Sequence, residues 1–439
     1  MSLLLAVAAG AAGSPAWAEE STPLKVTVNG DVKSFFVATL PYENELYTTL
    51  GIFPEAPTAQ GILDGRLKLK AEAGGVRLLA HHALTALTPA AALSTTQTGV
   101  GLTAPQLVDL TWQAWAPEDG ETAGADAMVL RGRTDRLALS TDAGPLTLSI
   151  GRQPISLGNG LAFTPMDLVS PFFPTTVDQE YKPGVDSVTA DLFFGMSTQI
   201  SAITAYVHPD PLADAEDWAV AGMAHVLYAQ HTFWRNDVGL LLGEIRGDEV
   251  LGLTVASYAG PVGLHGDVTY TLPDDDDEEP FLRAVAGALW MPRGGTTLSG
   301  EVYHQTLGAT EPADYLTQLS TERYTRGELW LAGRTYASVS LGQEITPLLQ
   351  GSLAVIANVA EPSALIAPGI SVSISDEVQL AAGGFAGVGA RPDEGSLEDL
   401  LDPETGSLLE GAALNEAMGL NSEFGFYPAS AYVQLKAYF

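Results

Sequence analysis

The sequence contains no cysteine among its 439 residues. This absence excludes a disulfide framework and a lipid anchor attached to cysteine. Charged residues are also scarce, at 17% of the chain, against roughly 25% in an ordinary soluble domain. Basic residues are rarer than acidic residues, with 20 Lys and Arg against 53 Asp and Glu, which gives a formal charge of −33. Nucleic acid is therefore not expected as a partner, because its binding requires a positive surface.

Long apolar runs are missing as well. After the N-terminus no stretch of about 18 consecutive apolar residues occurs, which argues against transmembrane helices. A closed β-barrel is the other backbone arrangement that can cross lipid, because closure pairs the backbone N–H and C=O groups of every strand. The apolar fraction of 46%, together with the few charges, therefore favours a membrane barrel.

The first 18 residues predict an export signal. They are mostly apolar and end in Ala16-Trp17-Ala18, an A-x-A cleavage site before Glu19. The positively charged segment that normally opens such a signal is missing, which leaves the true start codon open. We predict a signal peptide over 1–18 and a single outer-membrane barrel domain over 19–439.

Segments of about ten residues with alternating polarity recur from Pro23 to the end, each bounded by turn residues. We count eighteen, with predicted spans 23–40, 61–72, 75–88, 127–141, 144–153, 184–194, 197–208, 220–234, 238–246, 249–259, 262–272, 281–291, 295–308, 328–344, 347–360, 363–374, 377–389 and 428–439. The predicted fold class is all-β, a transmembrane antiparallel β-barrel of about 18 strands.

The lengths of the links support the barrel. Links after even-numbered segments have one to three residues, whereas most links after odd-numbered segments are long. The long links are 41–60, 89–126, 154–183, 209–219, 273–280, 309–327 and 390–427. Outer-membrane barrels are organised in this way, with short turns on the periplasmic side. A soluble sandwich or propeller has no physical reason to sort its loops by length.

Alternation also assigns a face to each side chain. In segment 61–72, Leu63 and Leu67 share one face, while Arg66 and Lys68 share the other. The apolar face must meet lipid, because a charge there costs a few kcal/mol at mid-membrane. A polar, water-filled interior follows. The aromatic residues near strand ends that we expect in interfacial girdles are Phe35, Phe36, Phe193, Phe194, Phe233, Trp234, Trp290 and Tyr336.

The chain ends on SAYVQLKAYF, in which Val433, Leu435, Ala437 and Phe439 alternate with polar or amphipathic residues. We predict that this last strand pairs with the first and closes the barrel. The ending resembles the C-terminal signal of bacterial outer-membrane proteins. That resemblance implies that Phe439 acts as an assembly signal, recognised by the barrel-assembly machinery.

The most distinctive segment is the link between the fifth and sixth strands. Its five prolines and paired glycines rule out a continuous helix or strand, and its many apolar residues predict a loop that folds inward and narrows the pore. The pattern comprises Gly151-Arg152-Gln153, Gly158-Asn159-Gly160, Phe163, Pro165, Asp167, Asp178, Glu180, Lys182-Pro183-Gly184 and Asp186.

This pattern resembles a group of porin-like proteobacterial barrels that includes alginate-export and uncharacterised outer-membrane proteins. The resemblance covers under a tenth of the chain and departs from the group at Leu157, where Trp is expected, and at Lys182, where Arg is expected. It implies an eighteen-stranded barrel with passive transport or export, and it leaves the substrate open.

Two hypotheses account for the uneven distribution of charge. In the first, basic wall residues face acidic residues of the loop across a constriction, and the field between them orders small polar solutes. The predicted basic wall is Arg66, Lys68, Lys70, Arg77, Arg131, Arg133 and Arg136, and the predicted pore-loop residues are Arg152, Asp167, Asp178, Glu180, Lys182 and Asp186. In the second, the basic groups pair with interior carboxylates such as Asp64, Glu72 and Asp135. Alternation from Ile150 places Arg152 on the lipid side.

Catalysis is not predicted. The seven histidines are scattered over different strands, and no serine motif accompanies them. We predict no cofactor and no metal site. The leading function is a porin-like channel for passive diffusion of small polar or charged solutes. The alternatives are an export conduit for an anionic polymer, a component of an envelope complex, and a plugged structural barrel. The expected partners are outer-membrane lipid and small solutes, and oligomer formation stays open.

Overall fold

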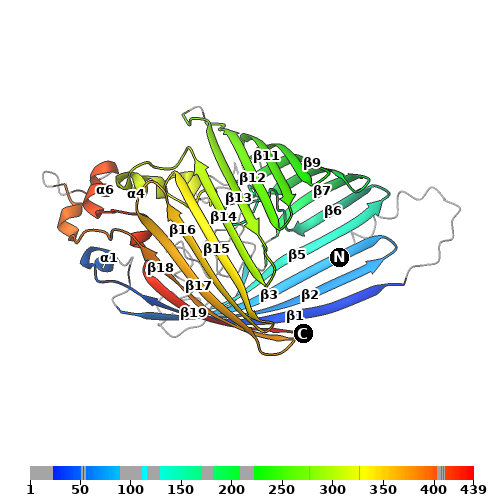
Figure 1. Ribbon diagram of the computed structural model, residues 1–439, viewed down its shortest axis with the longest axis horizontal. Coiled ribbons are helices and arrows are strands. Elements are labelled where there is room, and N and C mark those ends of the chain that lie inside the picture. The colour runs from blue at the N-terminus through cyan, green and yellow to red at the C-terminus, as the bar shows by residue number, and fades with distance from the viewer. Residues whose placement is uncertain are drawn as a thin grey trace.

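The computed structural model describes most of the chain. The described residues are 23–50, 53, 56–88, 111–115, 129–170, 181–182, 184–207, 222–275, 277–325, 327–402, 407, 409 and 411–439. Their strands form one antiparallel sheet, which curls into a closed barrel (Figure 1). The first strand pairs with both the second and the last, and this double pairing closes the ring.

The strands are β1 (Lys25–Leu40), β2 (Thr58–Ala73), β3 (Val76–Leu87), β4 (Thr111–Trp115), β5 (Val129–Ala143), β6 (Leu146–Gln153), β7 (Val185–Phe194), β8 (Thr198–Tyr206), β9 (Met223–Phe233), β10 (Asn236–Ile245), β11 (Asp248–Ala259), β12 (Val262–Leu272), β13 (Phe281–Trp290), β14 (Thr296–Gln305), β15 (Thr335–Thr346), β16 (Leu349–Asn358), β17 (Ser363–Ser373), β18 (Val378–Val388) and β19 (Ala429–Tyr438). The helices are α1 (Glu45–Thr49), α4 (Tyr315–Leu319), α5 (Glu322–Thr325) and α6 (Gly411–Met418), and the 3₁₀ turns are η1 (Pro312–Asp314), η2 (Leu397–Leu400) and η3 (Phe424–Phe426).

Eighteen of these strands form the ring. β3 pairs directly with β5, and β4 pairs with the first residues of β5, beyond the point where β6 ends. The eighteen-stranded antiparallel barrel predicted from the sequence is therefore confirmed. The predicted segment 262–272 coincides with β12, and β4 is an addition that the sequence pattern did not predict.

The last strand closes the barrel as predicted. β19 pairs with β1 from Asp31 to Leu40. Beyond this ladder, the backbone N–H groups of Gly30 and Phe439 each donate to the carbonyl of the other, at 2.8 and 3.0 Å. The ring of Phe439 lies over Gly30, where any Cβ atom would collide with it. Glycine at this position therefore makes room for the terminal aromatic ring.

The two faces of the wall follow the alternation of the sequence. Leu63 and Leu67 of β2 are 49% and 53% exposed, while Arg66 between them is 4% exposed. Val26 and Val28 of β1 are likewise exposed. The apolar side chains point outward and the charged side chains point into the barrel, as the cost of charge in lipid requires.

The long loops gather at one end of the barrel together with α1, α4 and α6 (Figure 1). Leu46, Tyr315 and Met418, one from each helix or its end, belong to one buried apolar cluster. Within the described residues, none of the helices is both long and apolar enough to cross a membrane. These short helices therefore serve to pack the loops against one another.

A buried contact between two loops, centred on Glu423, was not predicted from the sequence. Glu423, buried beside η3, accepts hydrogen bonds from the backbone N–H of Ala332 at 2.9 Å, from Asn358 Nδ2 at 3.1 Å and from the hydroxyl of Tyr336. The prediction of Tyr336 in an interfacial girdle was wrong, because this side chain is fully buried inside the barrel. Phe35 is buried as well. Both side chains have the parity of inward-facing residues, Phe35 that of Lys33 and Tyr336 that of Ser338, so position near a strand end does not by itself place an aromatic side chain in a girdle.

One strand starts later than predicted. The segment predicted from residue 328 becomes β15 only at Thr335. The residues before it fold inward instead, and Leu329 and Leu331 are almost fully buried. Burial against other loops, rather than lipid, explains their apolar character.

An arginine joins two of the long loops to the start of β11. Arg323 of α5 pairs with Asp248 at 2.6 Å, with Glu328 at 3.0 Å and with Glu278, and its guanidinium lies 4.7 Å from the ring centre of Phe281. The guanidinium is nearly buried, so it neutralises carboxylates that would otherwise repel each other. Glu278 belongs to the acidic run 274–279, which is thus anchored at one point.

Candidate functional site

The link between β6 and β7, residues 154–184, is called the inward loop here. Its described part crosses the interior of the barrel, because it hydrogen-bonds to β12 and β14. These strands lie six and eight positions from β6 around a ring of eighteen. The prediction that this segment folds inward therefore agrees with the described residues.

Two carboxylates on the far wall hold the tip of the loop. Asp267 of β12 accepts the backbone N–H groups of Asn159 and Gly160, both at 2.8 Å. Glu301 of β14 accepts the next three backbone N–H groups, those of residues 161–163, at 2.6, 2.8 and 3.1 Å. Successive backbone N–H groups that converge in this way form a concave anion site, and here the anions are side chains of the wall.

The glycines of the motif make this geometry accessible. Gly158 has φ +88°, a value that favours glycine. A Cβ atom at Gly160 would collide with the carbonyl oxygen of Phe163. The Gly-Asn-Gly motif therefore serves to turn the backbone so that its N–H groups face Asp267 and Glu301.

Apolar side chains of the loop fill one side of the interior. Met166 and Val169 join a buried cluster with Leu241 of β10 and Val250 of β11. Phe163 is fully buried and stacks on Tyr303, with ring centres 5.1 Å apart. The inward loop therefore narrows the interior beside β10, β11 and β14.

A buried ion pair ties the middle of the loop to its C-terminal end. Lys182 Nζ donates to both carboxylate oxygens of Asp167, at 2.6 and 2.5 Å, and also to Ser156 Oγ at 2.9 Å. Burial raises the pKa of Asp167 to about 6, although Lys182 opposes the rise. Burial lowers the pKa of Lys182 in turn. Both shifts come from the loss of water around the charges.

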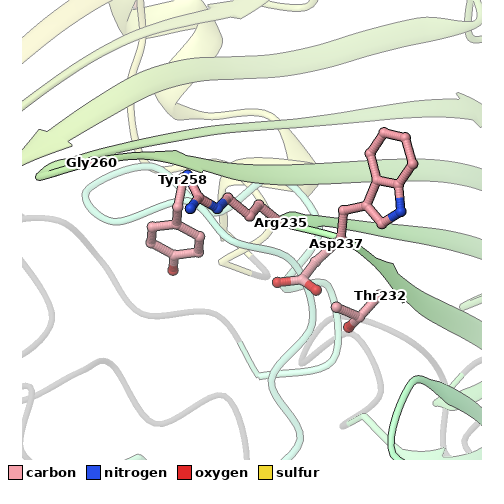
Figure 2. Close-up of a pocket in the computed structure, with 6 residues that line it drawn as sticks. Thr232, Arg235, Asp237, Tyr258 and Gly260 are labelled. Carbon is pink, nitrogen blue, oxygen red and sulfur yellow. The ribbon is translucent and has the colours of Figure 1, made fainter.

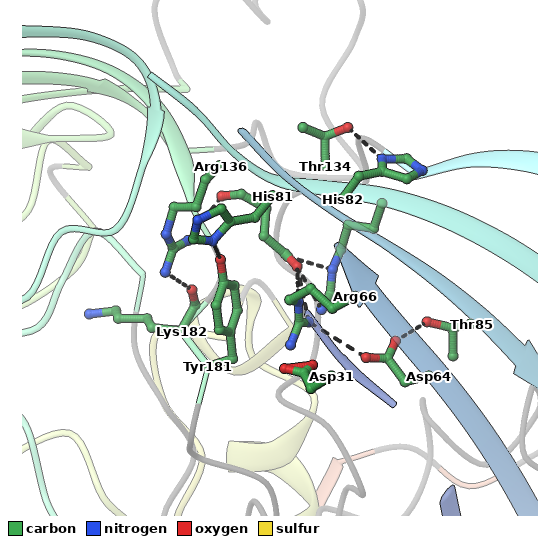
Figure 3. Close-up of polar contacts among 12 residues, drawn as sticks. Asp31, Asp64, Arg66, His81, His82, Thr85, Thr134, Arg136, Tyr181 and Lys182 are labelled. Carbon is green, nitrogen blue, oxygen red and sulfur yellow. Dashed lines mark hydrogen bonds and ion pairs between the residues drawn. The ribbon is translucent and has the colours of Figure 1, made fainter. Parts of the chain in front are cut away.

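The opposite wall carries a cluster of charged side chains (Figure 3). Asp135 of β5 lies between two guanidinium groups, with Arg66 NH2 at 3.0 Å and Arg133 Nε at 2.6 Å. Lys68 Nζ pairs with Asp31 of β1 at 2.7 Å. The buried carboxylates Asp31 and Asp135 each face a cation, as burial of charge requires.

Tyr181 joins the inward loop to this cluster. Its ring centre lies 3.9 Å from the guanidinium carbon of Arg66 and 4.6 Å from that of Arg136. Its hydroxyl contacts His81 Nδ1, and Figure 3 shows the ring between Arg66 and Arg136. Cations over an aromatic face attract its quadrupole, so the loop and the wall hold each other.

A bulge in β5 brings these groups to one face. In the β3–β5 ladder, His81 lies opposite Arg136 and His82 lies opposite Thr134, which leaves Asp135 as the extra residue. Strict alternation would send Arg133 and Arg136 to opposite faces. The bulge changes the phase, so that Asp135 and both arginines point inward.

The other predicted residues lie away from this cluster. Lys70 pairs with Glu72 at 2.7 Å, and Arg77 pairs with Asp142 at 3.0 Å near the short turns. Arg131 lies opposite Thr85 in the β3–β5 ladder, on the same side of β5 as Arg133. Asp178 and Glu180 lie outside the described residues.

Arg152 and Asp186 lie opposite each other in the β6–β7 ladder and form a bidentate pair at 2.9 and 2.8 Å. Arg152 also lies opposite Leu137, which is 55% exposed. The pair is therefore on the outward face, the side that alternation from Ile150 indicated.

Several contributors to the site were missed from the sequence. His81 and Tyr181 contact the cluster, and Asp267 and Glu301 hold the loop. Alternation placed Asp267 on the inner face, but nothing in the sequence indicated that the loop would reach it. Among the described residues, no group of three or more His, Asp or Glu side chains is arranged to hold a metal ion.

No known family model matches this sequence, and no curated protein matches it. Solved structures do match it. OccAB3 of Acinetobacter baumannii aligns with a TM-score of 0.55 at 8% identity, over 94% of this chain and 99% of that chain. OpdK of Pseudomonas aeruginosa, solved with vanillate, aligns with a TM-score of 0.55 at 10% identity, over 94% and 98%. A BenF-like porin from Pseudomonas fluorescens Pf-5 aligns with a TM-score of 0.55 at 9% identity, over 94% and 98%. Nearly the whole chain thus has the fold of these porins.

Proposed function

We propose that this chain is an outer-membrane channel through which small polar or charged solutes diffuse passively. The observation that carries the proposal is the charged cluster on β1, β2 and β5, which faces the interior of a closed barrel. The porin fold of the matched structures supports it. No catalytic step is required.

The cluster favours solutes that carry a carboxylate. Its basic members are Arg66, Lys68, Arg133 and Arg136, and its acidic members are Asp31, Asp64 and Asp135. Lys33, buried on the inner face of β1 opposite Asp64, adds a fifth cation. Five basic against three acidic side chains leave two positive charges in excess, and guanidinium groups match carboxylates well. The matched OpdK was solved with vanillate, a small aromatic carboxylate, which is the solute class proposed here.

The test is electrical. Purified protein in a planar bilayer should conduct, and the reversal potential in a salt gradient should shift toward cation preference in Arg66→Ala and Lys68→Ala. Lys70→Ala tests whether the predicted basic wall extends as far as Lys70. Arg293→Ala, which removes an exposed charge in a short turn, serves as the control. Conductance and selectivity that stay unchanged in all of the wall variants would remove the constriction from the proposal.

The plugged structural barrel is the second candidate. Two buried apolar clusters at the long-loop end, which include Tyr47, Phe163 and Phe424, show how much of the interior the loops occupy. A liposome swelling assay separates the candidates. Swelling in small neutral sugars supports the channel, whereas intact insertion without swelling or current favours the plugged barrel.

The resemblance of the Gly-Asn-Gly loop to alginate-export and related barrels supports a further alternative, an export conduit for an anionic polymer or a component of an envelope complex. This alternative predicts stronger anion preference than the two excess positive charges in the cluster provide. Blockade of the current by an anionic polysaccharide, but not by small carboxylates, would support it over the channel.

The proposal locates the protein in the outer membrane of a Gram-negative bacterium, in contact with lipid. Residues 1–18 then act as the export signal, and Phe439 as the signal for the barrel-assembly machinery. Expression of a Phe439 deletion should lower the amount of folded protein in the outer membrane. An oligomer is compatible with the proposal and is tested by cross-linking in native membranes.

A further inference from the structure

A cavity of about 410 Å³ lies at the short-turn end of β9, β10 and β11. Its lining residues are Thr232, Trp234, Arg235, Asp237, Tyr258 and Gly260 (Figure 2). The volume falls within the range of small-ligand sites, roughly 300–1,000 Å³. The cavity is separate from the charged cluster, which lies on β1, β2 and β5.

The cavity belongs to the interior of the barrel. On β10, Leu240 and Leu242 are exposed toward lipid, while Leu241 is fully buried. Asp237 has the same parity as Leu241, so its side chain points inward. Thr232 lies directly opposite Asp237 in the β9–β10 ladder and shares this face. Tyr258 has the parity of the buried Thr254 on β11, so these polar groups face the water-filled mouth.

The backbone at Trp234 is unusual for its residue type. Trp234 has φ +58°, and its side chain is 96% exposed. Other short turns place glycine where φ is positive, as at Gly144 and Gly260, and Arg246 in the β10–β11 turn is the one other non-glycine exception among the described residues. A non-glycine residue in this region costs of order 1 kcal/mol or more and tends to persist where it has a function. Glycine would be the more stable choice if the turn had only to join two strands.

Two opposite charges line the same cavity. Arg235 lies in the turn and Asp237 begins the inward face of β10. Among the residues that the structure describes, neither forms an ion pair. Two charges of opposite sign beside two aromatic rings match a ligand with a carboxylate, an ammonium group and an apolar ring. The guanidinium suits the carboxylate, the Asp237 carboxylate suits the ammonium group, and Trp234 and Tyr258 suit the ring.

We propose that this cavity is a binding subsite for zwitterionic solutes with an aromatic or apolar side chain, such as aromatic amino acids, at the periplasmic mouth. The inference deepens the proposed function, on which it rests for the direction of passage and the aqueous interior. Solutes that pass the charged cluster by their carboxylate would be held a second time at the exit, where the ammonium group is also recognised.

The experiment is isothermal titration calorimetry of the whole protein in detergent, with three related probes. L-phenylalanine carries both charges, 2-phenylethylamine lacks the carboxylate, and 3-phenylpropionate lacks the ammonium group. L-phenylalanine should bind most tightly, because hydrogen bonds to charged groups each account for roughly tenfold or more in affinity. Equal affinity of all three probes would overturn the proposal.

Two variants test which charge of the ligand Asp237 and Arg235 each bind. Asp237→Asn should weaken L-phenylalanine about tenfold and leave 3-phenylpropionate unchanged. Arg235→Gln should weaken L-phenylalanine and leave 2-phenylethylamine unchanged. Asp376→Asn, an exposed acid in another short turn, is the matched control and should not change binding. A loss of affinity in the control equal to that in Asp237→Asn would contradict a local site.

Trp234→Gly separates binding from folding. Glycine suits the positive φ, so the melting temperature should stay the same or rise, while L-phenylalanine binding should weaken about tenfold, because the ring contact is lost. Unchanged affinity in a folded Trp234→Gly protein would overturn the role of this residue.

The failure of this site and the failure of the proposed channel give different results. Calorimetric binding without conductance leaves the subsite and removes the channel, whereas conductance without binding leaves the channel and removes the subsite. A lipid headgroup has related charges, so the titration is repeated in nanodiscs of phosphatidylethanolamine and of phosphatidylglycerol. Equal affinities in both support a site inside the barrel. A loss of affinity only in phosphatidylethanolamine would assign the cavity to lipid and overturn the proposal.

Discussion

The attachment of the inward loop depends on one side chain of the wall more than on any other. Glu301 is 3% exposed and accepts three backbone N–H groups of the loop together with His265 Nε2 at 2.6 Å. The variant Glu301→Gln keeps the size of the side chain and replaces one carboxylate oxygen with an NH2 group. Whichever oxygen is replaced, a new donor then faces at least two donors.

The magnitude follows from these contacts. Each hydrogen bond to a charged group contributes about 1.5–3 kcal/mol, and loss of two of them removes at least about 3 kcal/mol from the free energy of loop attachment. This loss raises the population of the detached loop roughly 100-fold. The barrel itself should stay folded, because the ladders of β14 with β13 and β15 do not involve this side chain.

Hydrogen exchange measures the effect directly. The amides of residues 161–163 should exchange roughly 100-fold faster in Glu301→Gln, while amides in the β12–β14 ladders keep their protection. Single-channel conductance should rise, because the loop no longer narrows the interior. Glu249→Gln changes an exposed acid on the outward face of β11 and serves as the control. Unchanged exchange at residues 161–163 would falsify the carboxylate anchor.

Further predictions concern the loops, the wall and the closure of the barrel. Arg323→Met removes the cation that Asp248, Glu328 and Glu278 share and should loosen the loops around it by about 3–5 kcal/mol, which limited proteolysis in the 274–279 run detects. Burial raises the pKa of Glu423 to about 7, so its contribution to loop packing is present below the ordinary pKa of about 4.5 and is lost as the pH rises through about 7. The protection factors of residues 420–427, which correct for the base-catalysed intrinsic exchange rate, should be lower at pH 8.5 than at pH 5.5, and Glu423→Gln should abolish this difference. Gly30→Ala places a methyl group against the ring of Phe439 and should lower the folded fraction on heat-modifiability gels, whereas Gly65→Ala, at a position with open space, should not. Asp135→Asn removes a carboxylate between two guanidinium groups and should shift the reversal potential toward anion preference, and an unchanged potential would contradict the placement of this cluster beside the ion path.

The ring of strands could be predicted from the sequence because its cause is local. Each strand faces lipid on one side, so period-2 alternation appears within every ten residues. The lengths of the links indicate the order of the strands around the ring. β12 occupies the predicted residues 262–272. Apolar residues that pack against loops rather than lipid carry the same signal, which is why the strand predicted from residue 328 starts only at Thr335.

The candidate site could be predicted only in part. Composition marks the inward loop and alternation marks the basic residues of β2, whereas alternation alone does not place both Arg133 and Arg136 of β5 inside. The partners of the loop were not found, because Glu301 lies about 140 residues further along the chain from the N–H groups that it accepts. Contacts across the interior depend on the curvature of the whole ring, and a single sequence contains no local sign of it.

The bulge in β5 shows how one extra residue determines which charged side chains face the interior. Without it, a single phase of alternation would place Arg133 inward and Arg136 outward, or the reverse, and Tyr181 would lose one of its two guanidinium partners. With it, Asp135 also points inward and binds Arg66 and Arg133. The wall thus presents its cations already paired or stacked, so they are fixed in position rather than free to follow a solute. In the proposed channel a carboxylate solute would then meet a rigid array, and its selection would depend on geometry more than on the net charge of the chain.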